Sequence, residues 1–285
     1  MNTTQGRIAF QGALGAYSHQ ACAEAFPEME PLPCNTFEGA IAAVREGRAE
    51  LAMLPVENST YGRVADIHSL LPGSGLYIVG EHFVRVHICL LGVPGATIAD
   101  VREAVSHTVL LGQCRSFLEG HDIARVTDSD TAGAAKHVAQ DANPARAALA
   151  SELAGSIYGL EVLARNIEDN SHNTTRFLVM SPRKIEAAPQ EPDVITTFVF
   201  QVRNIPAALY KAMGGFATNG VNMTKLESYM VGGAFTATQF YADITGHPEE
   251  AHVRRALEEL RYFTTNVAIL GVYPASALRK EQAAG

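Results

Sequence analysis

The feature that most constrains the fold is an alternation of short apolar runs and helical stretches over the first two-thirds of the chain. Arg7–Gly12 is a short apolar run, and a helical stretch from Ser18 to Phe26 follows it. Thr36–Gly47 predicts a second helix, because Thr36 can cap its start and Gly47 can stop it. Further runs with the character of strands are Leu51–Val56, Thr108–Leu111, Ala124–Val126 and Arg146–Ala150. This alternation is typical of parallel sheets with helices on both faces, and it predicts an α/β fold.

A long apolar stretch, Leu76–Val93, interrupts the alternation. It is rich in β-branched residues and is bounded by turns at Pro72-Gly73 and Pro94-Gly95. It is either a pair of strands or one segment that crosses between two lobes. A comparable run, Thr175–Met180, ends the same region and favours the crossing. Two α/β lobes joined by two crossings would leave a cleft between them, where ligands tend to bind.

From Ser181 to Pro192 the composition changes to Pro, Glu, Gln and Ala, which predicts a linker. The elements expected after it are Val194–Arg203, Ile205–Asn219, Val221–Met230, Phe235–Thr245, Glu249–Phe263 and Val267–Tyr273. Their βαββαβ order predicts an α+β domain of the ferredoxin-like type. We therefore expect a two-lobed α/β domain over 1–182, a linker over 183–193, an α+β domain over 194–277 and a tail over 278–285.

Charge and composition narrow the range of partners. The 285 residues carry a net charge of −8, so nucleic acid and anionic membranes are not expected to bind. No apolar run approaches the ~20 residues that span a bilayer, and the short polar N-terminus leaves no room for a secretory signal. The four cysteines have no CxxC spacing, so we expect reduced thiols, no metal site and a cytoplasmic location.

Two polar clusters follow predicted strands, where ligands bind in open α/β sheets. In Gly12–Ser18 the glycines allow close approach of a ligand, and Ser18 can cap a helix whose N–H groups would bind a carboxylate. The GxGxxG spacing of a dinucleotide loop is absent, whereas an ordinary strand-to-helix turn remains an alternative. The second cluster lies in Leu54–Gly62, where a self-capping turn is the alternative. Its polar side chains are Glu57, Asn58, Ser59 and Thr60.

Two more polar clusters lie further along the chain. Asp128–Gly133 places Thr131 at a predicted helix start, a second candidate anion site, although most such caps bind only their own helix. Asn170–Phe177 is the densest polar cluster, and Arg176 in it could pair with a carboxylate in a two-point fork. His172 could titrate near neutrality, but a lone histidine is more often a hydrogen-bonding surface residue. Because the motifs of serine hydrolases, zinc proteases and phosphate loops are absent, such sites would protonate a leaving group or shelter an anion.

In order and spacing these clusters resemble the signatures of the prephenate dehydratase family, over nearly the whole chain. The resemblance implies a two-lobed fold similar to type II periplasmic binding proteins. It also implies a cofactor-free carbon–oxygen lyase that converts prephenate to phenylpyruvate, water and CO2. Thr175 matches the family's essential threonine, whose hydroxyl would hydrogen-bond to or protonate the departing oxygen. Glu57 would repel the dianionic substrate as a carboxylate, so we expect it to orient neighbours or to be protonated. The implied substrate-binding residues are Ser18, Glu57, Asn58, Ser59, Thr60, Thr131, Asn173, Thr174, Arg176 and Phe177.

The C-terminal βαββαβ unit resembles an ACT domain, the amino-acid-sensing module attached to that family. This implies phenylalanine as an effector and a homodimer or homotetramer in which sheets pair. The implied effector contacts are Ala207, Ala208, Leu209, Asn222, Glu227 and Ser228. Two motifs depart from the family pattern. Pro206-Ala-Ala-Leu209 replaces a Gly-Ala-Leu turn, and Glu227-Ser-Tyr-Met230 replaces Glu-Ser-Arg-Pro.

Two other functions fit the same residues. Arogenate dehydratase, or an enzyme that accepts both substrates, shares the chemistry, because arogenate has an amino group where prephenate has a keto oxygen. A non-catalytic small-molecule sensor also fits a two-lobed protein with an ACT domain, although no helix-turn-helix segment is evident. We expect a monofunctional enzyme, since neither a mutase nor a dehydrogenase domain is recognisable.

Overall fold

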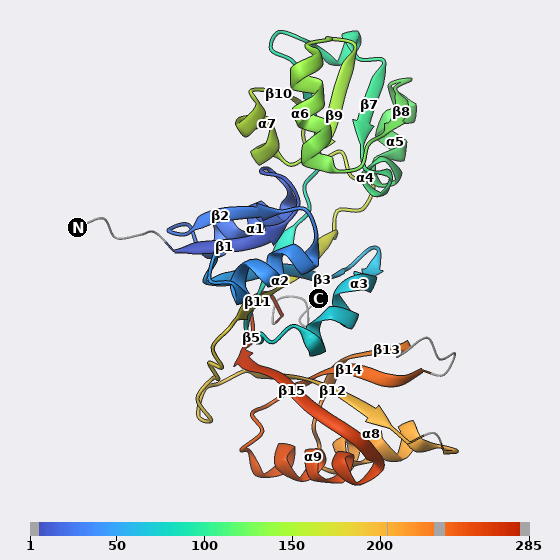
Figure 1. Cartoon of the computed structure of the whole chain (residues 1–285). Helices are drawn as coiled ribbons and strands as arrows, with labels where there is room; N and C mark the ends of the chain where they lie inside the picture. The colour runs from blue at the N-terminus through green and yellow to red at the C-terminus, as the bar shows by residue number, and fades with distance from the viewer. Residues whose placement is uncertain (1–5, 204, 231–236, 280–285) are drawn as a thin grey trace, which may run out of the picture. The chain divides into compact units, whose positions relative to one another are not determined.

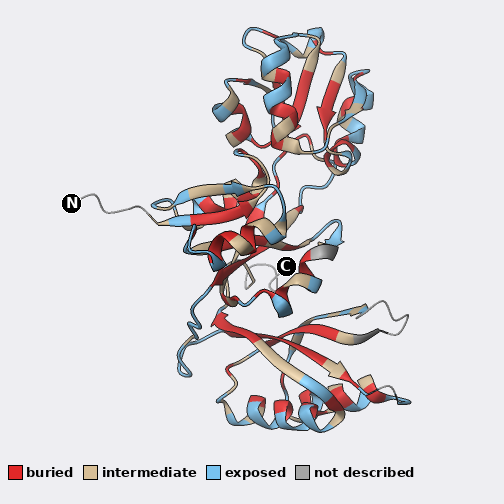
Figure 2. Cartoon of the chain, in the orientation of Figure 1, coloured by how far each residue is buried: buried red, intermediate tan, exposed pale blue. Residues whose placement is uncertain are grey.

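The computed structural model of the chain describes residues 6–203, 205–230 and 237–279 (Figure 1). The chain divides into two compact units. The first unit contains residues 1–63 and 83–177, and the second unit contains residues 64–82 and 178–285. The inner strands of the sheets are largely buried, several edge strands have no buried residue, and the longer helices have a buried inner face and an exposed outer face (Figure 2).

The first unit contains two sheets. In one of them the strand order is β11-β3-β1-β2, and β1 pairs in parallel with β2 and with β3. Its elements are β1 (Arg7–Gln11), α1 (Tyr17–Ala25), β2 (Glu30–Cys34), α2 (Phe37–Arg45), β3 (Leu51–Asn58), β4 (Gly62–Arg63) and β11 (Thr174–Ser181). The predicted cap at Thr36 is confirmed, because its Oγ1 accepts a hydrogen bond from the Gly39 N–H at 3.0 Å.

The second sheet of the first unit has the order β10-β6-β9-β7-β8. Its elements are β6 (Cys89–Gly92), η2 (Ile98–Asp100), β7 (Glu103–Ser106), α4 (Thr108–Gln113), α5 (Arg115–Gly120), β8 (Ala124–Thr127), α6 (Thr131–Asp141), β9 (Arg146–Ala150), α7 (Glu152–Tyr158) and β10 (Glu161–Ala164). Helices α6 and α7 pack into one core on this sheet, and α4 and α5 pack into another. The prediction of helices on both faces is therefore confirmed for this sheet. The prediction of parallel sheets is correct in part, because β7 pairs in parallel with β8 and β9 whereas β6 pairs antiparallel with β9 and β10.

Two local predictions need correction. Thr108–Leu111 is not a strand but the start of α4, and His107 caps this helix by accepting a hydrogen bond from the Val109 N–H. A short apolar run cannot be assigned to helix or strand by periodicity, and here the strand is β7, just upstream. Leu76–Val93 contains two strands, β5 (Tyr77–Arg85) and β6, which lie in different sheets. The predicted crossing is thus confirmed, with a strand on each side of it.

The C-terminal part of the second unit has the predicted βαββαβ order. The elements are β12 (Val194–Val202), α8 (Ala208–Thr218), β13 (Met223–Met230), β14 (Ala237–Thr245), α9 (Ala251–Phe263) and β15 (Thr264–Pro274). The strand order is β13-β14-β12-β15, with antiparallel neighbours. Helices α8 and α9 lie on the same face (Figure 1), and a core rich in phenylalanine fills the space between them and the sheet. The predicted start of β14 at Phe235 lies outside the described residues, as does the tail beyond residue 279.

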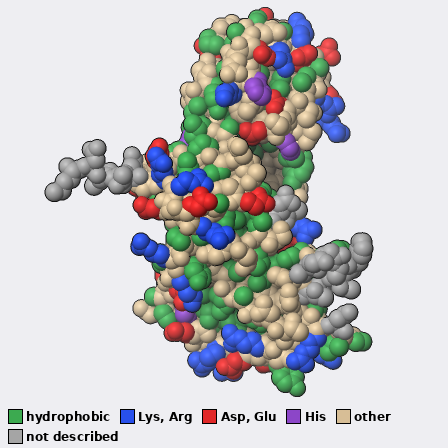
Figure 3. All heavy atoms as spheres, viewed as in Figure 1, with side chains coloured by type: hydrophobic (Ala, Val, Ile, Leu, Met, Phe, Trp, Pro, Cys, Tyr) green, Lys and Arg blue, Asp and Glu red, His purple; other side chains and the backbone are tan. Residues whose placement is uncertain are grey.

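The second unit also contains a segment from the middle of the predicted α/β domain. Residues 64–82 hold α3 (Ala65–Leu70), η1 (Leu71–Gly73) and most of β5. β5 pairs in parallel with β15 through Ile78 and Gly271. No helix of the described residues is long and apolar enough to cross a membrane. On the face in Figure 3, Lys and Arg side chains are interspersed with Asp and Glu side chains, which is not the pattern of a basic nucleic-acid surface.

Candidate active site

The site begins with a hydrogen bond between two neighbouring strands, β3 and β11. The Asn58 amide Nδ2 donates to the Thr175 hydroxyl at 3.0 Å and to Asn173 Oδ1 at 2.7 Å. The Asn58 Oδ1 accepts hydrogen bonds from the backbone N–H groups of Thr60 and Tyr61, at 3.0 and 2.9 Å. These four contacts fix the orientation of the amide, so its N–H groups can point only toward Thr175 and Asn173.

Ser59 joins the same two segments. Its hydroxyl donates to the backbone oxygen of His172 at 2.8 Å and accepts from the Thr174 N–H at 2.9 Å. The Ser59 N–H in turn donates to the Thr174 carbonyl at 2.9 Å. Ser59 therefore holds the Asn173–Thr175 segment next to Asn58. A contact between Ser59 and the substrate stays a prediction.

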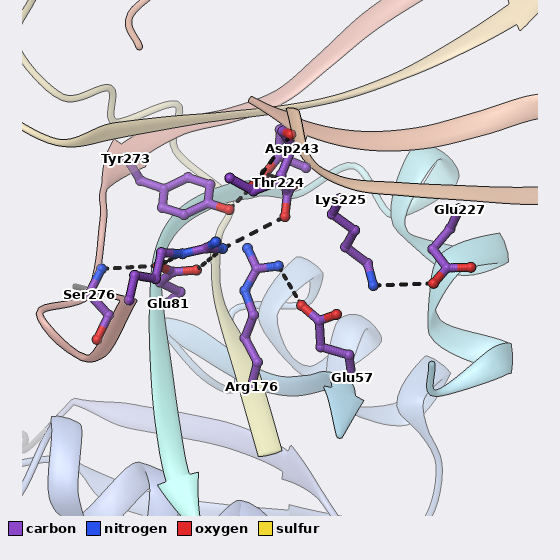
Figure 4. A network of polar contacts seen from close by, with 11 residues as sticks. Glu57, Glu81, Arg176, Thr224, Lys225, Glu227, Asp243, Tyr273 and Ser276 are labelled. Carbon is purple, nitrogen blue, oxygen red and sulfur yellow. Dashed lines mark hydrogen bonds and ion pairs between the residues drawn. The ribbon is translucent and has the colours of Figure 1, made fainter. Parts of the chain in front are cut away.

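Glu57 lies one residue before Asn58 on β3, and Arg176 lies one residue after Thr175 on β11. Arg176 Nη1 donates to Glu57 Oε1 at 2.8 Å (Figure 4). The Arg176 side chain is 2% exposed and that of Glu57 is 32% exposed. Because successive side chains point to opposite faces of a strand, the ion pair and the Asn58–Thr175 pair lie on opposite faces. The predicted orienting role of Glu57 agrees with this geometry, whereas a direct substrate contact by Arg176 stays a prediction.

A small cavity lies next to this cluster, between the two lobes of the first unit. Its volume is about 140 Å³, and it is lined by Thr60, Tyr61, Gly112, Gln113, Glu168, Asp169, Asn170 and Asn173. Two buried polar atoms of this lining, Asn173 Nδ2 and Gln113 Oε1, have no hydrogen-bond partner among the described residues. An unpaired buried polar atom is costly, so a donor and an acceptor left unpaired in one cavity indicate a polar ligand or water there.

Gln113 was missed from the sequence. The signal available was a polar residue in the apolar run Thr108–Cys114, where it is 8% exposed. The first part of that run, Thr108–Leu111, was predicted to be a strand, so a helix that carries Gln113 on its buried side was not expected. Only the packing of α4 against the segment that carries Asn173 brings the two side chains into one cavity.

The Gly12–Ser18 loop is built differently from the prediction. The N-cap of α1 is Ala16, without a side-chain cap, and Ser18 is a buried residue inside the helix. The cap prediction for Ser18 is therefore wrong, because the helix starts one residue earlier than expected. Gly15 has φ +92°, and a Cβ on it would lie 2.7 Å from the Ala154 Cα, so only glycine allows this approach to the other lobe.

Side chains from α7 and α1 hold the Gly12–Ser18 loop in place. Ser151 Oγ donates to the Gly15 carbonyl at 2.6 Å, and the Tyr158 hydroxyl donates to the Leu14 carbonyl at 2.9 Å. The Gly15 N–H donates to His19 Nδ1 at 2.9 Å, which requires that nitrogen to be unprotonated. Burial lowers the pKa of His19, which favours the neutral ring.

Thr131 is the first residue of α6, as predicted, but another side chain caps the helix. The Asp130 carboxylate accepts hydrogen bonds from the Thr131 and Gly133 N–H groups, at 2.8 and 3.0 Å. These are the N–H groups that an anion at the helix start would use. The geometry therefore argues against an anion site at this helix start. Phe177, another predicted substrate contact, is a core residue at 1% exposure.

Burial makes the thiols of the first unit poor nucleophiles. It raises the pKa of Cys22 to about 12 and that of Cys89 to about 11, and it also raises the pKa of Cys114. Among the described residues, no group of three or more His, Cys, Asp or Glu side chains is placed to hold a metal ion.

The predicted effector residues are spread along the second unit. Ala207 is the N-cap of α8 with φ +60°, Ala208 is buried, and Leu209 packs against the core. Asn222 lies beyond the other end of this helix, which is about 16 Å long. It lines a pocket of about 630 Å³ together with Thr224, Thr245 and Arg279. The predicted set therefore does not gather at one place within a single chain.

Glu227 and Ser228 belong to β13. Glu227 Oε1 lies 3.4 Å from Lys225 Nζ, and Ser228 is exposed. They point to opposite faces of the strand, because they are neighbours on it. Their role in effector binding stays a prediction.

Two α/β lobes around a cavity lined by hydroxyl, amide and carboxylate groups define a class of two-lobed ligand-binding proteins. The family model "PDT: Prephenate dehydratase" matches residues 8–185. The chain therefore belongs to the prephenate dehydratase family. Its two-sheet, periplasmic-binding-protein-like α/β architecture agrees with the fold that this membership implies.

Known proteins of similar sequence carry related names. A protein of Komagataeibacter europaeus, "Bifunctional N-acyl-homoserine lactone acylase/prephenate dehydratase", is 54% identical over 96% of this chain and 98% of its own length. "Arogenate dehydratase/prephenate dehydratase 1, chloroplastic" of Arabidopsis thaliana is 36% identical over 96% of this chain and 73% of its own length.

Two solved structures are similar over most of the chain. One is described as "GqqA- a novel type of quorum quenching acylases", with a TM-score of 0.90 and 54% identity over 96% of this chain and 99% of that chain. The other is a prephenate dehydratase from Arthrobacter aurescens in complex with L-Phe. Its TM-score is 0.85, with 29% identity over 94% of this chain and 89% of that chain.

Proposed function

We propose that the chain is a prephenate dehydratase, which converts prephenate to phenylpyruvate, water and CO2 in the biosynthesis of L-phenylalanine. One observation supports this above the others. Asn58 donates to the Thr175 oxygen, so the Thr175 hydroxyl hydrogen is left to donate to another group. A threonine whose oxygen is already hydrogen-bonded is oriented as a donor toward the leaving oxygen of a substrate.

The reaction consumes one proton and needs no redox partner. The bond from C4 of the ring to its hydroxyl breaks, and the hydroxyl leaves as water. The bond from the ring to its carboxylate also breaks, and its electron pair completes the aromatic ring as CO2 leaves. Thr175 donates a hydrogen bond to the departing oxygen, and the proton that completes water comes from solvent. A threonine is a weak acid, so its contribution is the stabilisation of charge on that oxygen.

The other groups of the site would position the substrate. Asn173 Nδ2 supplies a second donor, and Gln113 supplies an amide from the opposite lobe. Neither is a strong base, which agrees with a reaction that removes no proton from carbon. Arogenate differs from prephenate only in an amino group, and nothing in the Asn58–Thr175 pair discriminates between them. The plant relative is named for both arogenate and prephenate, whereas the bacterial relative is named for prephenate and not for arogenate. Preference for prephenate is therefore the finer part of the proposal.

We further propose that the βαββαβ part of the second unit is an ACT domain and that L-phenylalanine is its effector. The support is its element order and the L-Phe complex of the Arthrobacter aurescens relative. Effector residues that are spread over one chain agree with a site completed by a second copy, so we propose a homodimer or homotetramer. A cytoplasmic location belongs to the same proposal, and the single activity expected from the sequence stays a prediction.

The identity to the Komagataeibacter europaeus relative supports a second activity, hydrolysis of N-acyl-homoserine lactones. Such hydrolysis adds water across the amide bond and releases a fatty acid and homoserine lactone. The raised pKa values of Cys22 and Cys89 exclude them as ready nucleophiles. The reaction would therefore use a hydroxyl or a bound water, and the Thr175 cluster is the candidate. If no fatty acid is released from such a lactone by the purified chain, this second activity is rejected.

The decisive experiment follows phenylpyruvate formation by ultraviolet absorbance with prephenate, and runs arogenate in parallel. The variants are Thr175→Ala, Thr175→Ser and, as a matched control in the second unit, Thr265→Ala. We expect Thr175→Ala to lose about 10²-fold or more of kcat, Thr175→Ser to keep part of it, and the control to match wild type. Absence of turnover of both substrates by wild type would reject the dehydratase. Turnover of arogenate alone would change the substrate and keep the mechanism.

A further inference from the structure

The cavity beside the Asn58–Thr175 pair has an acidic lining. Two of the residues that line it are carboxylates, Glu168 and Asp169. Among the described residues of the lining, none is a lysine, an arginine or a histidine. The Glu168 side chain is 4% exposed. Because water is largely excluded from a buried carboxylate, its charge acts on a ligand more strongly than a surface charge would.

The two carboxylates differ in the groups that already bind them. Asp169 accepts hydrogen bonds from two backbone N–H groups at the start of α5, at 3.0 and 3.2 Å, so it serves that helix. Glu168 Oε2 accepts one backbone hydrogen bond, from the Ile88 N–H at 2.9 Å. Its Oε1 lies 3.3 Å from Nδ1 of His87, whose side chain is 53% exposed, so water screens any charge on that ring. An ionised carboxylate has about four acceptor positions, so Glu168 can still accept a hydrogen bond from a ligand.

Two amide atoms of the same lining show which groups a ligand must bring. Asn173 Nδ2 is a donor and Gln113 Oε1 is an acceptor, and neither has a hydrogen-bond partner among the described residues. The two residues are 1% and 8% exposed. A ligand that pairs both must offer an acceptor and a donor. The amino-acid end of arogenate offers both, because its carboxylate accepts and its ammonium group donates. The keto-acid end of prephenate offers acceptors only.

The size of the cavity suits one end of the substrate. Its volume is about 140 Å³, whereas sites that enclose a drug-sized ligand measure ~300–1,000 Å³. Asn58 joins the cavity to the candidate catalytic hydroxyl, because its Nδ2 donates both to Asn173 and to Thr175. A substrate whose amino-acid end lies beside Asn173 would therefore carry its ring toward Thr175.

The charge of the cavity distinguishes the two substrates. The ammonium group gives arogenate one negative charge fewer than prephenate, and it places a cation where the lining is acidic. With prephenate, the Gln113 amide can turn its NH2 group toward the keto oxygen. Glu168 would then face a group with no hydrogen to donate, and this contact is unfavourable.

We propose that this cavity binds the amino-acid end of arogenate, and that Glu168 is the specificity-determining residue that accepts a hydrogen bond from its ammonium group. The chain then converts arogenate to phenylalanine, water and CO2 through the same bond changes as prephenate, beside the same Thr175 hydroxyl. The inference rests on the proposed dehydratase function, and it adds a second substrate and the residue that recognises it.

The test compares kcat/KM for arogenate and for prephenate in wild type and three variants. Glu168→Gln keeps an acceptor for the Ile88 N–H and removes the charge, whereas Glu168→Asp keeps the charge. The matched control is Glu161→Gln, which removes a carboxylate charge outside the cavity. Glu161 also accepts a backbone hydrogen bond through Oε2, from the Gly95 N–H at 3.0 Å.

We expect wild type to turn over both substrates. In Glu168→Gln the ratio of kcat/KM for arogenate to that for prephenate should fall at least tenfold, which corresponds to ~1.4 kcal/mol. Glu168→Asp should keep the ratio close to that of wild type even where both rates fall, and Glu161→Gln should match wild type in both rates. A merely structural role of Glu168 would lower both rates together and leave the ratio unchanged.

An unchanged ratio in Glu168→Gln, or an equal change in Glu161→Gln, would overturn the inference. Turnover of prephenate alone by wild type would overturn it as well and leave the dehydratase proposal standing. If wild type turns over neither substrate, the dehydratase proposal fails, and isothermal titration calorimetry of the two compounds with wild type and Glu168→Gln decides what the cavity binds. At least tenfold weaker binding of arogenate alone in the variant would support the assignment, whereas equal binding would refute it.

Discussion

Asn58 Nδ2 lies 3.0 Å from Thr175 Oγ1 and donates a hydrogen bond to it, while their neighbours Glu57 and Arg176 form an ion pair on the opposite face of the same two strands. Both contacts depend on one register between β3 and β11. A slip of one residue would turn every side chain to the other face and break both pairs. The ion pair and the hydroxyl–amide pair therefore require the same register of the two strands, and each stabilises the register that the other needs.

Replacing Asn58 by Asp tests the direction of the hydrogen bond to Thr175. An ionised carboxylate still accepts from the Thr60 and Tyr61 N–H groups, but it cannot donate. Thr175 would then donate its hydrogen to Asp rather than to the substrate. We expect kcat for prephenate to fall by about 10²-fold or more, with a smaller change in KM. Asn143→Asp, in an exposed turn, is the control, and a kcat near that of wild type for Asn58→Asp would contradict this role.

Glu57→Gln tests the ion pair with Arg176. Because Arg176 is buried, loss of the charged partner should lower the free energy of unfolding by about 1.5–3 kcal/mol. The control is Glu46→Gln, which removes the partner of Arg48 in a pair whose side chains are both more than half exposed. That change should cost less than about 1 kcal/mol. Urea unfolding followed by circular dichroism measures both, and equal losses would mean that burial does not strengthen the inner pair.

Gly15→Ala should separate the Gly12–Ser18 loop from α7. The added Cβ would meet the Ala154 backbone, and φ +92° disfavours alanine. A destabilisation of about 1–3 kcal/mol is expected from the backbone strain. Gly120→Ala, where a Cβ meets nothing within 4 Å and φ is not positive, should be neutral or slightly stabilising. Thermal unfolding compares the two, and a neutral Gly15→Ala would show that the loop can move away freely.

Ala207→Gly should stabilise the second unit. Ala207 has φ +60°, which glycine adopts without cost, so relief of strain should outweigh the greater freedom of glycine in the unfolded chain. We expect a gain of about 0.5 kcal/mol. Ala217→Gly, an exposed position inside α8, should instead lose about 1 kcal/mol. The two unfolding midpoints should therefore move in opposite directions, and a loss in both would contradict the strain at Ala207.

Stability should fall as the pH is lowered, because of His19. Burial lowers the pKa of His19 in the folded chain below its unfolded value of ~6.5. The unfolded state therefore binds more protons between the two values, and stability rises with pH across that window. The contribution is present in full above pH ~6.5 and is lost as pH falls through the folded pKa. His19→Gln removes this slope, so unfolding free energies measured from pH 7 to pH 5 should converge for the two proteins; parallel profiles would contradict the assignment.

Local sequence patterns determined most of the architecture. Alternating apolar and amphipathic segments predicted the α/β lobes, and the βαββαβ order predicted the C-terminal sheet, because periodicity reports which face of each element is buried. The resemblance to prephenate dehydratases, and not the local pattern, predicted that the clusters around Asn58 and Thr175 belong to one site, because one cluster follows a predicted strand and the other precedes one.

Tertiary structure decided what periodicity cannot show. It formed the helix α4 where a strand was expected, and it brought Gln113 into the same cavity as Asn173. It also made Asp130 the residue that caps α6. It also joined residues 64–82 to the C-terminal sheet through Glu81 and Gly271, although they lie in the middle of the predicted α/β domain. Such contacts join residues far apart in the chain, and their stability comes from burial and charge pairing that exist only once the elements have packed.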